Sequence, residues 1–142
     1  MKKVRDVKLT PDDLRIFEQQ VKDVDQKIEL QMFDTKEKLI DIFQYVHKDD
    51  WVFASWRNHY HALLHGVERD TLMDMIVRGK SMSVYSKTPK FYSSSIVGGI
   101  IPIALGTAKA MKDSGSKRKT WCFIGDMTFE TGIFYESYKY AK

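Results

Sequence analysis

The sequence has few of the residues that mark several common classes of protein. It contains one cysteine, Cys122, which cannot form a disulfide within the chain, and no Cys/His cluster has the spacing of a structural zinc site. A secreted disulfide scaffold is therefore excluded. No stretch approaches the roughly 18 apolar residues of a membrane-spanning helix, and no apolar run follows the charged N-terminus as in a secretion signal. We expect a cytoplasmic protein that does not bind a membrane.

The charge balance argues against a nucleic-acid-binding protein. The 142 residues include 23 Lys and Arg against 19 Asp and Glu, which gives a formal net charge of +4. The basic residues are mixed with acidic ones, apart from the run 117–119, which is typical of a solvated turn. With 43% hydrophobic and 30% charged residues the chain can bury a core. We expect one modest globular domain.

Apolar residues recur at helical spacing in several segments. Helices are predicted at about residues 11–28, 35–47, 72–78, 97–112 and 133–142. Gly79 follows the last turn of one of them, and Pro102 falls near the first turn of another, where its missing N–H is tolerated.

One buried strand is predicted in the C-terminal half. Residues 120–124 are a continuous apolar run of strand length, typical of a strand covered on both faces, and Gly125-Asp126 follow it. Residues 51–54 are interpreted as a short extended segment. Residues 80–95, rich in Ser and Lys, are interpreted as a long loop. A helix, a buried strand and a helix open a parallel α/β unit.

The organisation that follows is a helical arm at about residues 10–47 and a core at about residues 48–142. Because a parallel sheet needs several strands, we expect this α/β fold to be incomplete at its C-terminus. It would be the N-terminal part of a larger domain, or a piece that another chain completes.

Asp126 is the first candidate for chemistry, because ligands of open α/β sheets bind at the carboxyl ends of strands. A carboxylate there can hold a divalent cation that bridges a phosphate. The alternative is that Asp126 only caps the following helix. Arg57, His59 and His61 are a second candidate group, suited to gripping phosphate or moving a proton. The alternative is that these three residues only cover the surface beside Trp51 and Trp56.

Three blocks of sequence, in order, resemble the alpha subunits of thiamine-diphosphate-dependent 2-oxo acid dehydrogenases. Residues 49–67, DDWVFASWRNHYHALLHGV, resemble the family's D-D-W-V-F-x-S-Y-R-x-H-x-x-x-L-x-x-G-V. Residues 91–106, FYSSSIVGGIIPIALG, resemble N-F-Y-G-G-(H/N)-G-I-V-G-A-Q-I-P-I-A-L-G. Residues 125–137, GDMTFETGIFYES, resemble G-D-G-A-x-x-E-G-x-x-x-E-A, the front half of the thiamine-diphosphate motif. The resemblance covers roughly residues 10–142 and implies that family's fold, a parallel sheet flanked by helices.

The resemblance implies a set of residues that hold the diphosphate of the cofactor. Asp126 would coordinate Mg²⁺, and the backbone at Met127 and Thr128 would approach the diphosphate. Trp56, which stands at the family's tyrosine, and Arg57 would contact the same group.

The resemblance also implies residues near the reacting end of thiamine diphosphate. Ser95 and Val97 would hold the aminopyrimidine through backbone groups. His59 would line the mouth of the active site, and Ser94 stands where relatives carry a catalytic His or an Asn. His59 and Ser94 are therefore the candidate catalytic residues.

The implied activity is decarboxylation and dehydrogenation of a 2-oxo acid or a related ketone, with a beta-type subunit or a second copy completing the cofactor site. We expect the 142 residues not to be active alone, because the motif's closing Asn pair does not occur before Lys142. A noncatalytic or assembly chain of the same fold stays open as an alternative. Met127, in place of the second glycine of G-D-G, and Ser94 favour that alternative.

Overall fold

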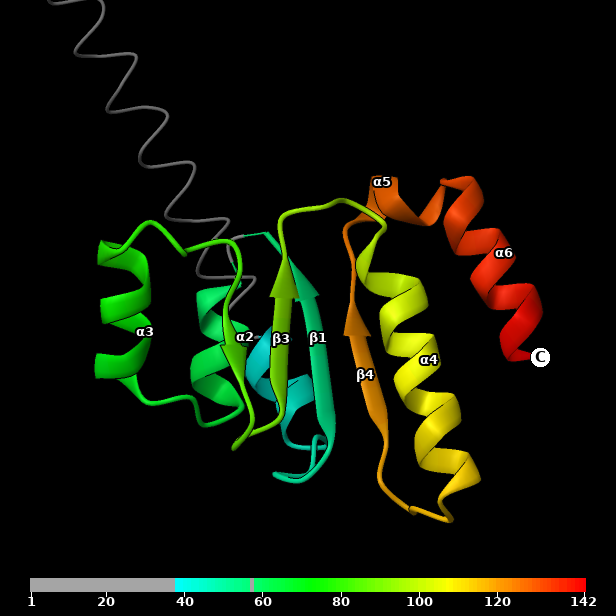
Figure 1. The fold of residues 1–142 in the computed structure, drawn as a ribbon, viewed down its shortest axis with the longest axis horizontal. Coiled ribbons are helices and arrows are strands. Elements are labelled where there is room, and N and C mark those ends of the chain that lie inside the picture. Colours follow the sequence, from blue (N-terminus) through cyan, green and yellow to red (C-terminus); the bar gives the residue numbers. More distant parts are fainter. Residues whose placement is uncertain (1–37, 57) are drawn as a thin grey trace, which may run out of the picture. The chain divides into compact units, whose positions relative to one another are not determined.

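The computed structural model describes residues 38–56 and 58–142, and residues 39–142 form one compact unit (Figure 1). The helix expected at 11–28 and the candidate Arg57 lie outside the described residues. The strands are β1 (Trp51–Ser55), β2 (Tyr85–Ser86), β3 (Phe91–Ser94) and β4 (Thr120–Phe123). The helices are α2 (His59–Leu64), α3 (Arg69–Val77), α4 (Ile100–Asp113), α5 (Asp126–Phe129) and α6 (Gly132–Ala141), and residues 38–43 are also helical.

The four strands form one sheet in the order β2-β3-β1-β4. The central strand β1 is parallel to both β3 and β4, while β2 is antiparallel to β3. In the register, Ser55 lies opposite Ser94, and Ala54 lies opposite Phe123. The carboxyl ends of β1, β3 and β4 therefore meet at one edge of the sheet, toward which their arrows point in Figure 1.

The predicted α/β class is confirmed, but the expectation of one strand is wrong. Residues 51–54, interpreted as a short extended segment, belong to the central strand, and residues 91–94 form β3 inside the predicted loop. β1 is buried on both faces, which its short apolar run did not reveal, because Ser and Trp follow it directly. β3 carries two serines in a buried position, and serine is not a residue that periodicity assigns to a core.

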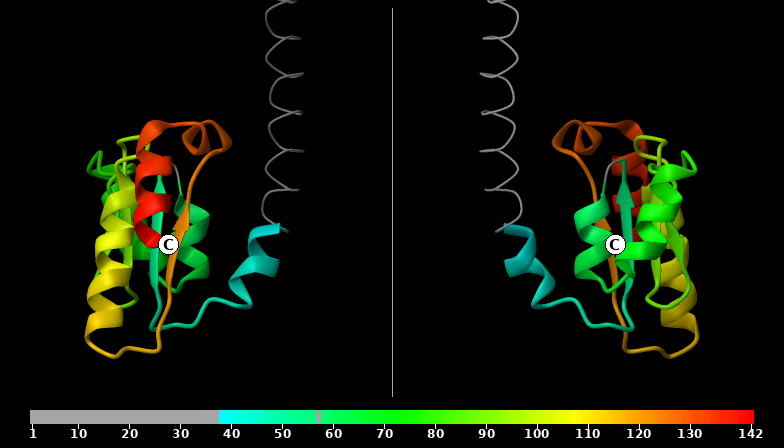
Figure 2. Two further views of the ribbon diagram at one scale, coloured as in Figure 1. Left: turned by 90° about the vertical axis from the view of Figure 1, so that its right-hand side faces the viewer. Right: turned by 90° about the vertical axis from the view of Figure 1, so that its left-hand side faces the viewer.

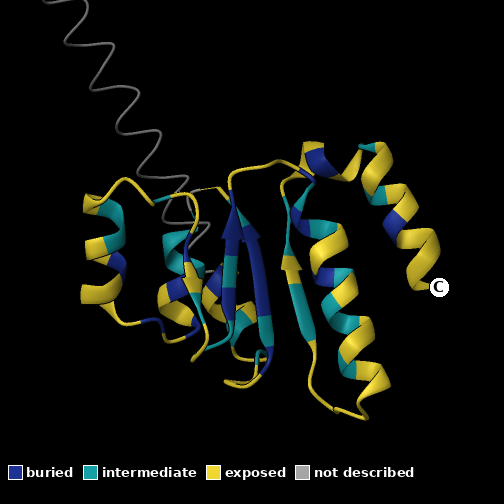
Figure 3. Ribbon diagram, in the orientation of Figure 1, coloured by how far each residue is buried: buried dark blue, intermediate teal, exposed yellow. Residues whose placement is uncertain are grey.

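Helices cover both faces of the sheet. Val52 and Ala54 pack in a cluster with side chains of α2 and α3, whereas Phe53 packs with Ile100 of α4. This alternation follows from the strand period of two residues. Figure 2 shows α2 and α4 on opposite sides of the sheet, and Figure 3 shows β1 and β3 as its most buried strands. Each fully buried large side chain, such as Phe91, contributes about 1.5–3 kcal/mol to folding.

Asp50 joins β1 to β4 at the amino ends of the strands, away from the candidate site. It is 2% exposed. Its carboxylate accepts hydrogen bonds from Lys119 N at 2.9 Å, Trp121 Nε1 at 2.9 Å and His47 N at 3.0 Å. Burial acts to raise the pKa of Asp50, but these hydrogen bonds outweigh it and the pKa is lowered. The carboxylate is therefore held ionised, which fixes the relative position of the two strands.

Several helix ends agree with the sequence prediction. α3 ends before Gly79, whose φ of +74° is the left-handed conformation of a helix terminus. Pro102 lies in the first turn of α4, and α6 covers the region expected to be helical near the C-terminus. The helix expected to reach residue 47 ends earlier, since residues 44–45 form a turn. Within the part of the chain that is described, no helix has the length and apolar character needed to cross a membrane.

Candidate functional site

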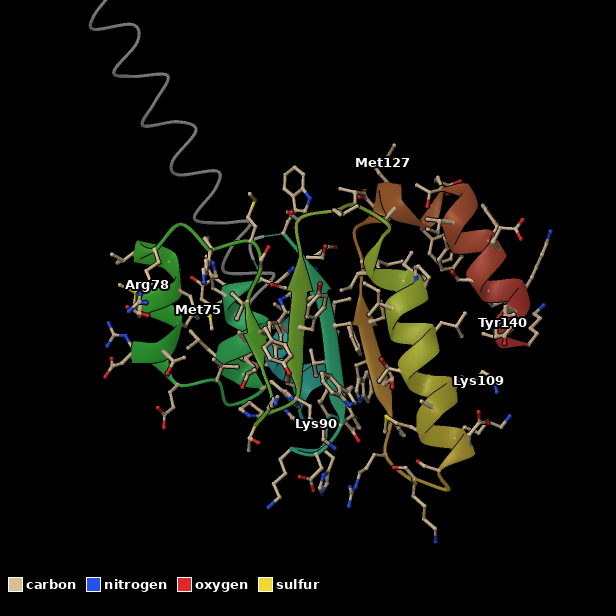
Figure 4. The ribbon with its side chains drawn as sticks, in the orientation of Figure 1. Met75, Arg78, Lys90, Lys109, Met127 and Tyr140 are labelled. Carbon is tan, nitrogen blue, oxygen red and sulfur yellow. The ribbon has the colours of Figure 1, made fainter. Side chains whose placement is uncertain are left out.

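The candidate site lies where the three parallel strands end. Trp56 follows β1, Ser95 follows β3, and Asp126 comes two residues after Ile124, at the end of the extended chain of β4. Figure 4 shows Met127 at this edge and Lys90 at the opposite end of the sheet. The parallel register therefore brings together residues that are 30 or more positions apart in the sequence, as ligand sites of open α/β sheets require.

Trp56 makes a sharp turn at the end of the central strand. Its φ is +62°, a left-handed conformation that is unusual for a residue other than glycine. The Trp56 N–H donates to the Ser94 carbonyl at 3.0 Å, and the Trp56 carbonyl accepts from Asn58 N at 2.8 Å and Asn58 Nδ2 at 3.3 Å. The indole is 48% exposed. Such backbone strain costs about 1–3 kcal/mol and is found most often at functional sites.

The loop after β3 is held by a local hydrogen bond. Ser94 is buried, and its hydroxyl oxygen accepts from Ile96 N at 3.1 Å. A serine hydroxyl that accepts a bond keeps its own hydrogen as a donor. Ser95 and Val97 are exposed at the same edge. Both residues are therefore at the surface that a ligand would meet.

Asp126 is the first residue of the short helix α5, and Gly125 occupies the N-cap position. The Asp126 carboxylate is exposed and accepts from Met127 N at 2.8 Å through Oδ1. Thr128 is buried, and its N–H donates to the Gly125 carbonyl at 3.0 Å. The turn thus presents a carboxylate at the sheet edge with its backbone held by local bonds.

Met127 projects from the end of α5. Its side chain is 74% exposed, and in Figure 4 it points outward from the sheet edge. The exposed thioether is an apolar group at the edge of the candidate site.

Gly98 connects the loop after β3 to the turn before α6, and the sequence reasoning missed it. Its φ is +79°, and a Cβ placed there would lie 2.9 Å from Ile133 Cγ2 and 4.0 Å from Thr128 Cγ2. Only glycine fits both the backbone conformation and the space. The sequence prediction placed Gly98 and Gly99 inside a helix at about 97–112, whereas α4 begins at Ile100.

The two candidate histidines lie in different surroundings. His59, the first residue of α2, has its Nε2 at 3.0 Å from both oxygens of Ser81. His61 packs with its ring centroid 4.7 Å from that of Phe123 and 6.1 Å from that of Phe43. Burial lowers the pKa of His61 to about 4, so its imidazole is neutral at pH 7. His61 is therefore part of an apolar cluster and not of the candidate site.

The residues at this edge are suited to a cation that also binds phosphate oxygens. They are less suited to a metal ion that is coordinated by protein side chains alone. Among residues 38–56 and 58–142, no group of three or more His, Cys, Asp or Glu side chains could hold a metal ion. Mg²⁺ commonly uses one or two carboxylates together with phosphate oxygens and waters. Asp126, exposed at the edge, suits that arrangement.

Comparisons with known proteins identify the family to which the chain is similar. Residues 24–142 match the family described as dehydrogenase E1 component. The chain is 31% identical over 104 residues to the pyruvate dehydrogenase E1 component subunit alpha of Rickettsia bellii, an alignment that covers 66% of this chain and 32% of that protein. It is 32% identical over 104 residues to the subunit of the same name from Porphyra purpurea, covering 61% and 30%. A third relative is the mitochondrial subunit alpha of Chaetomium thermophilum, 31% identical over 105 residues, covering 68% and 26%.

The chain spans about a third of the length of the curated relatives it matches. The matched family covers most of the chain, including every block of sequence on which the resemblance rests. The chain belongs to the dehydrogenase E1 component family and is similar to the alpha subunits of that family.

Proposed function

We propose that the chain binds thiamine diphosphate and Mg²⁺ at the carboxyl ends of β1, β3 and β4. The observation that carries this proposal is the convergence of Trp56, Ser95 and Asp126 at one edge of the sheet through the parallel register. A diphosphate needs a cation, a donor of hydrogen bonds and close approach of backbone. At this edge Asp126 could hold the cation, and the loops would bring a hydrogen-bond donor, Arg57, and the backbone of α5 to the proposed site.

Asp126 is the proposed Mg²⁺ ligand. Its exposed carboxylate is bound only locally, to Met127 N, so exchanging that contact for a cation leaves the sheet intact. The backbone at Met127 and Thr128 would approach the diphosphate beside it. Trp56 and Arg57 would contact the diphosphate from the central strand, where an arginine fork matches phosphate oxygens.

Ser95 and Val97, both exposed, are proposed to hold the aminopyrimidine through their backbone groups. His59 and Ser94 would face the substrate. The Ser94 hydroxyl oxygen accepts from Ile96 N, so its own hydrogen stays available as a donor.

The bound cofactor would supply an electron sink for cleavage beside the carbonyl of a 2-oxo acid or a related ketone. The residues of this chain would bind, orient and neutralise charge, and a beta-type partner subunit or a second copy would complete the site. The relatives' names specify pyruvate, which makes a small 2-oxo acid the proposed substrate class. The cytoplasm stays the proposed location, although the Chaetomium relative is a mitochondrial protein.

A noncatalytic or assembly chain of the same fold is the second candidate. It is favoured by the backbone N–H groups of Met127 and Thr128, which already have acceptors within the turn. If these groups keep their partners, the turn offers the diphosphate fewer donors than a glycine-rich turn would. This candidate retains the fold and binds no cofactor.

Calorimetric titration of the full chain, assembled with a beta-type partner subunit, separates the two candidates. We expect thiamine diphosphate to bind in the presence of Mg²⁺ and to lose its affinity in excess chelator. Equal affinity in both conditions would remove the metal from the proposal. An absence of binding in both conditions, for a complex that assembles, would favour the noncatalytic chain.

A further inference from the structure

His59 and Ser81 form a contact that links the start of α2 to the segment between α3 and β2. His59 Nε2 lies 3.0 Å from the carbonyl oxygen of Ser81 and 3.0 Å from its hydroxyl oxygen. Both residues are half-buried and 22 positions apart. The contact is therefore a tertiary one that sets how the imidazole is held.

The Ser81 carbonyl is fixed by hydrogen bonds on both sides of it. After α3, Gly79 N donates to Ile76 O and Lys80 N donates to Met75 O, the paired bonds that end many helices at a glycine. Ser83 N then donates to Lys80 O at 3.0 Å, closing a turn around Ser81.

Beyond that turn, Val84 is bound to β3. Val84 N donates to Ser93 Oγ at 2.9 Å, and Ser93 N donates to Val84 O at 2.8 Å. The segment that carries Ser81 is thus anchored at both ends, and the position of its carbonyl does not depend on His59.

The carbonyl decides which nitrogen of His59 bears the hydrogen. A carbonyl oxygen can only accept, and a neutral imidazole has one N–H and one bare nitrogen. If Nε2 carried no hydrogen, its lone pair would face a lone pair of the carbonyl oxygen 3.0 Å away, and the two would repel each other. An Nε2–H donates to it, and the serine hydroxyl oxygen can accept from the same hydrogen.

We propose that Ser81 is a positioning residue that holds His59 in the tautomer with hydrogen on Nε2. His59 then has Nδ1 as a bare acceptor. Resting on the proposed function, this means that His59 meets the substrate or cofactor as an acceptor for an O–H or N–H group, and not as an N–H donor. The backbone carbonyl of Ser81 keeps the imidazole of His59 from rotating. Replacing the side chain of Ser81 does not remove this carbonyl.

Nitrogen NMR of the full chain labelled with ¹⁵N-histidine tests the tautomer directly. The chain has four histidines, and the signal of His59 is the one missing in His59→Asn. At about pH 8.5 we expect a proton on Nε2 of His59 that is slow enough in exchange to be observed. The exposed His47 is the internal reference for a ring N–H that exchanges quickly.

Three variants at two positions separate the carbonyl from the hydroxyl. Ser81→Ala removes the hydroxyl only, so the Nε2 proton should remain, with the tautomer ratio at least about tenfold in its favour. Ser83→Pro removes the N–H that closes the turn, so the Nε2 proton of His59 should be lost, whereas the matched control Ser83→Ala should keep it. The buried His65, which contacts Asp50 O through Nε2, reports whether each variant is folded.

Two results would overturn the proposal: a proton on Nδ1 of His59 in the unmodified chain, or its appearance there in Ser81→Ala. Both are read without cofactor or substrate, so they are independent of whether thiamine diphosphate binds. For the functional part, His59→Asn places a side-chain oxygen near Nδ1, and His59→Gln places its amide near Nε2. We expect turnover of the assembled enzyme at least tenfold lower in the Gln variant. Equal turnover in both would show that Nδ1 is not the group in use.

Discussion

The backbone N–H of Trp56 donates to the carbonyl of Ser94 at 3.0 Å, one residue beyond the end of β1 (Trp51–Ser55). The bond continues the pairing of β1 with β3 to the residue whose φ is +62°. Strain and site therefore coincide, because the turn that is least favourable for the backbone is the one that directs the indole to the edge of the sheet.

Trp56→Gly is expected to separate stability from binding. Glycine adopts the left-handed conformation without strain, and the indole is half exposed, so little burial is lost. We expect the free energy of unfolding to change by less than about 1 kcal/mol, while affinity for thiamine diphosphate falls about tenfold. Urea denaturation and calorimetry measure the two quantities.

Trp56→Ala is the matched control, because it removes the same side chain and keeps the strain. It should be less stable than the glycine variant by about 1 kcal/mol. If the two variants are equally stable, Trp56 is not strained.

Gly98→Ala is expected to loosen the contact between the loop after β3 and the start of α6 (Gly132–Ala141). The added methyl would lie 2.9 Å from Ile133 Cγ2, and φ is +79°. We expect the free energy of unfolding to fall by about 2–3 kcal/mol. Gly106→Ala is the control, because that helical glycine has open space around it and should gain about 0.5–1 kcal/mol. Equal effects of the two substitutions in urea denaturation would disprove the close contact.

His61 is expected to make stability depend on pH below 6.5. The folded pKa is about 4 and the ordinary value is 6.5, so the unfolded chain binds the proton more readily. Stability is therefore complete above pH 6.5 and declines as the pH falls toward 4, by up to about 1.4 kcal/mol per unit. Urea denaturation at a series of pH values measures this slope.

His61→Leu should flatten the slope, because the site packs against Phe43 and Phe123, and the buried imidazole Nδ1 has no hydrogen-bond partner among the described residues. At pH 8 the variant should be at least as stable as the unmodified chain. A slope that survives in His61→Leu would assign the effect to other groups.

The sequence predicted the strand at 120–124 because an apolar run followed by Gly-Asp is a local signal. The expectation that this strand is covered on both faces is wrong, because β4 (Thr120–Phe123) is an edge strand of the described sheet and none of its residues is buried. β3 (Phe91–Ser94) had no such signal. Ser93 is buried because its hydroxyl accepts from Val84 N, a bond made across nine residues that no periodicity reveals. The central strand was recognised as extended, but its burial on both faces depends on helices contributed from elsewhere in the chain.

The sequence suggested which residues belong to the candidate site, but not how these residues are arranged. Asp126 was placed at a strand end by its position after 120–124, and the family resemblance named its neighbours. The left-handed turn at Trp56 and the close approach at Gly98 could not be predicted, because each depends on a tertiary contact, with Ser94 and with Ile133. The contact of His59 with Ser81 is of the same kind.

The carboxylate of Asp126 is the group on which the account depends most. Calorimetry of thiamine diphosphate in the presence of Mg²⁺, on the assembled chain, compares Asp126→Asn with Glu130→Gln, a nearby exposed carboxyl at the end of α5 (Asp126–Phe129). We predict that affinity falls at least tenfold, or about 1.4 kcal/mol, in Asp126→Asn and stays within about twofold in Glu130→Gln. Unchanged affinity in Asp126→Asn, or an equal loss in both variants, would contradict a magnesium site at this edge of the sheet.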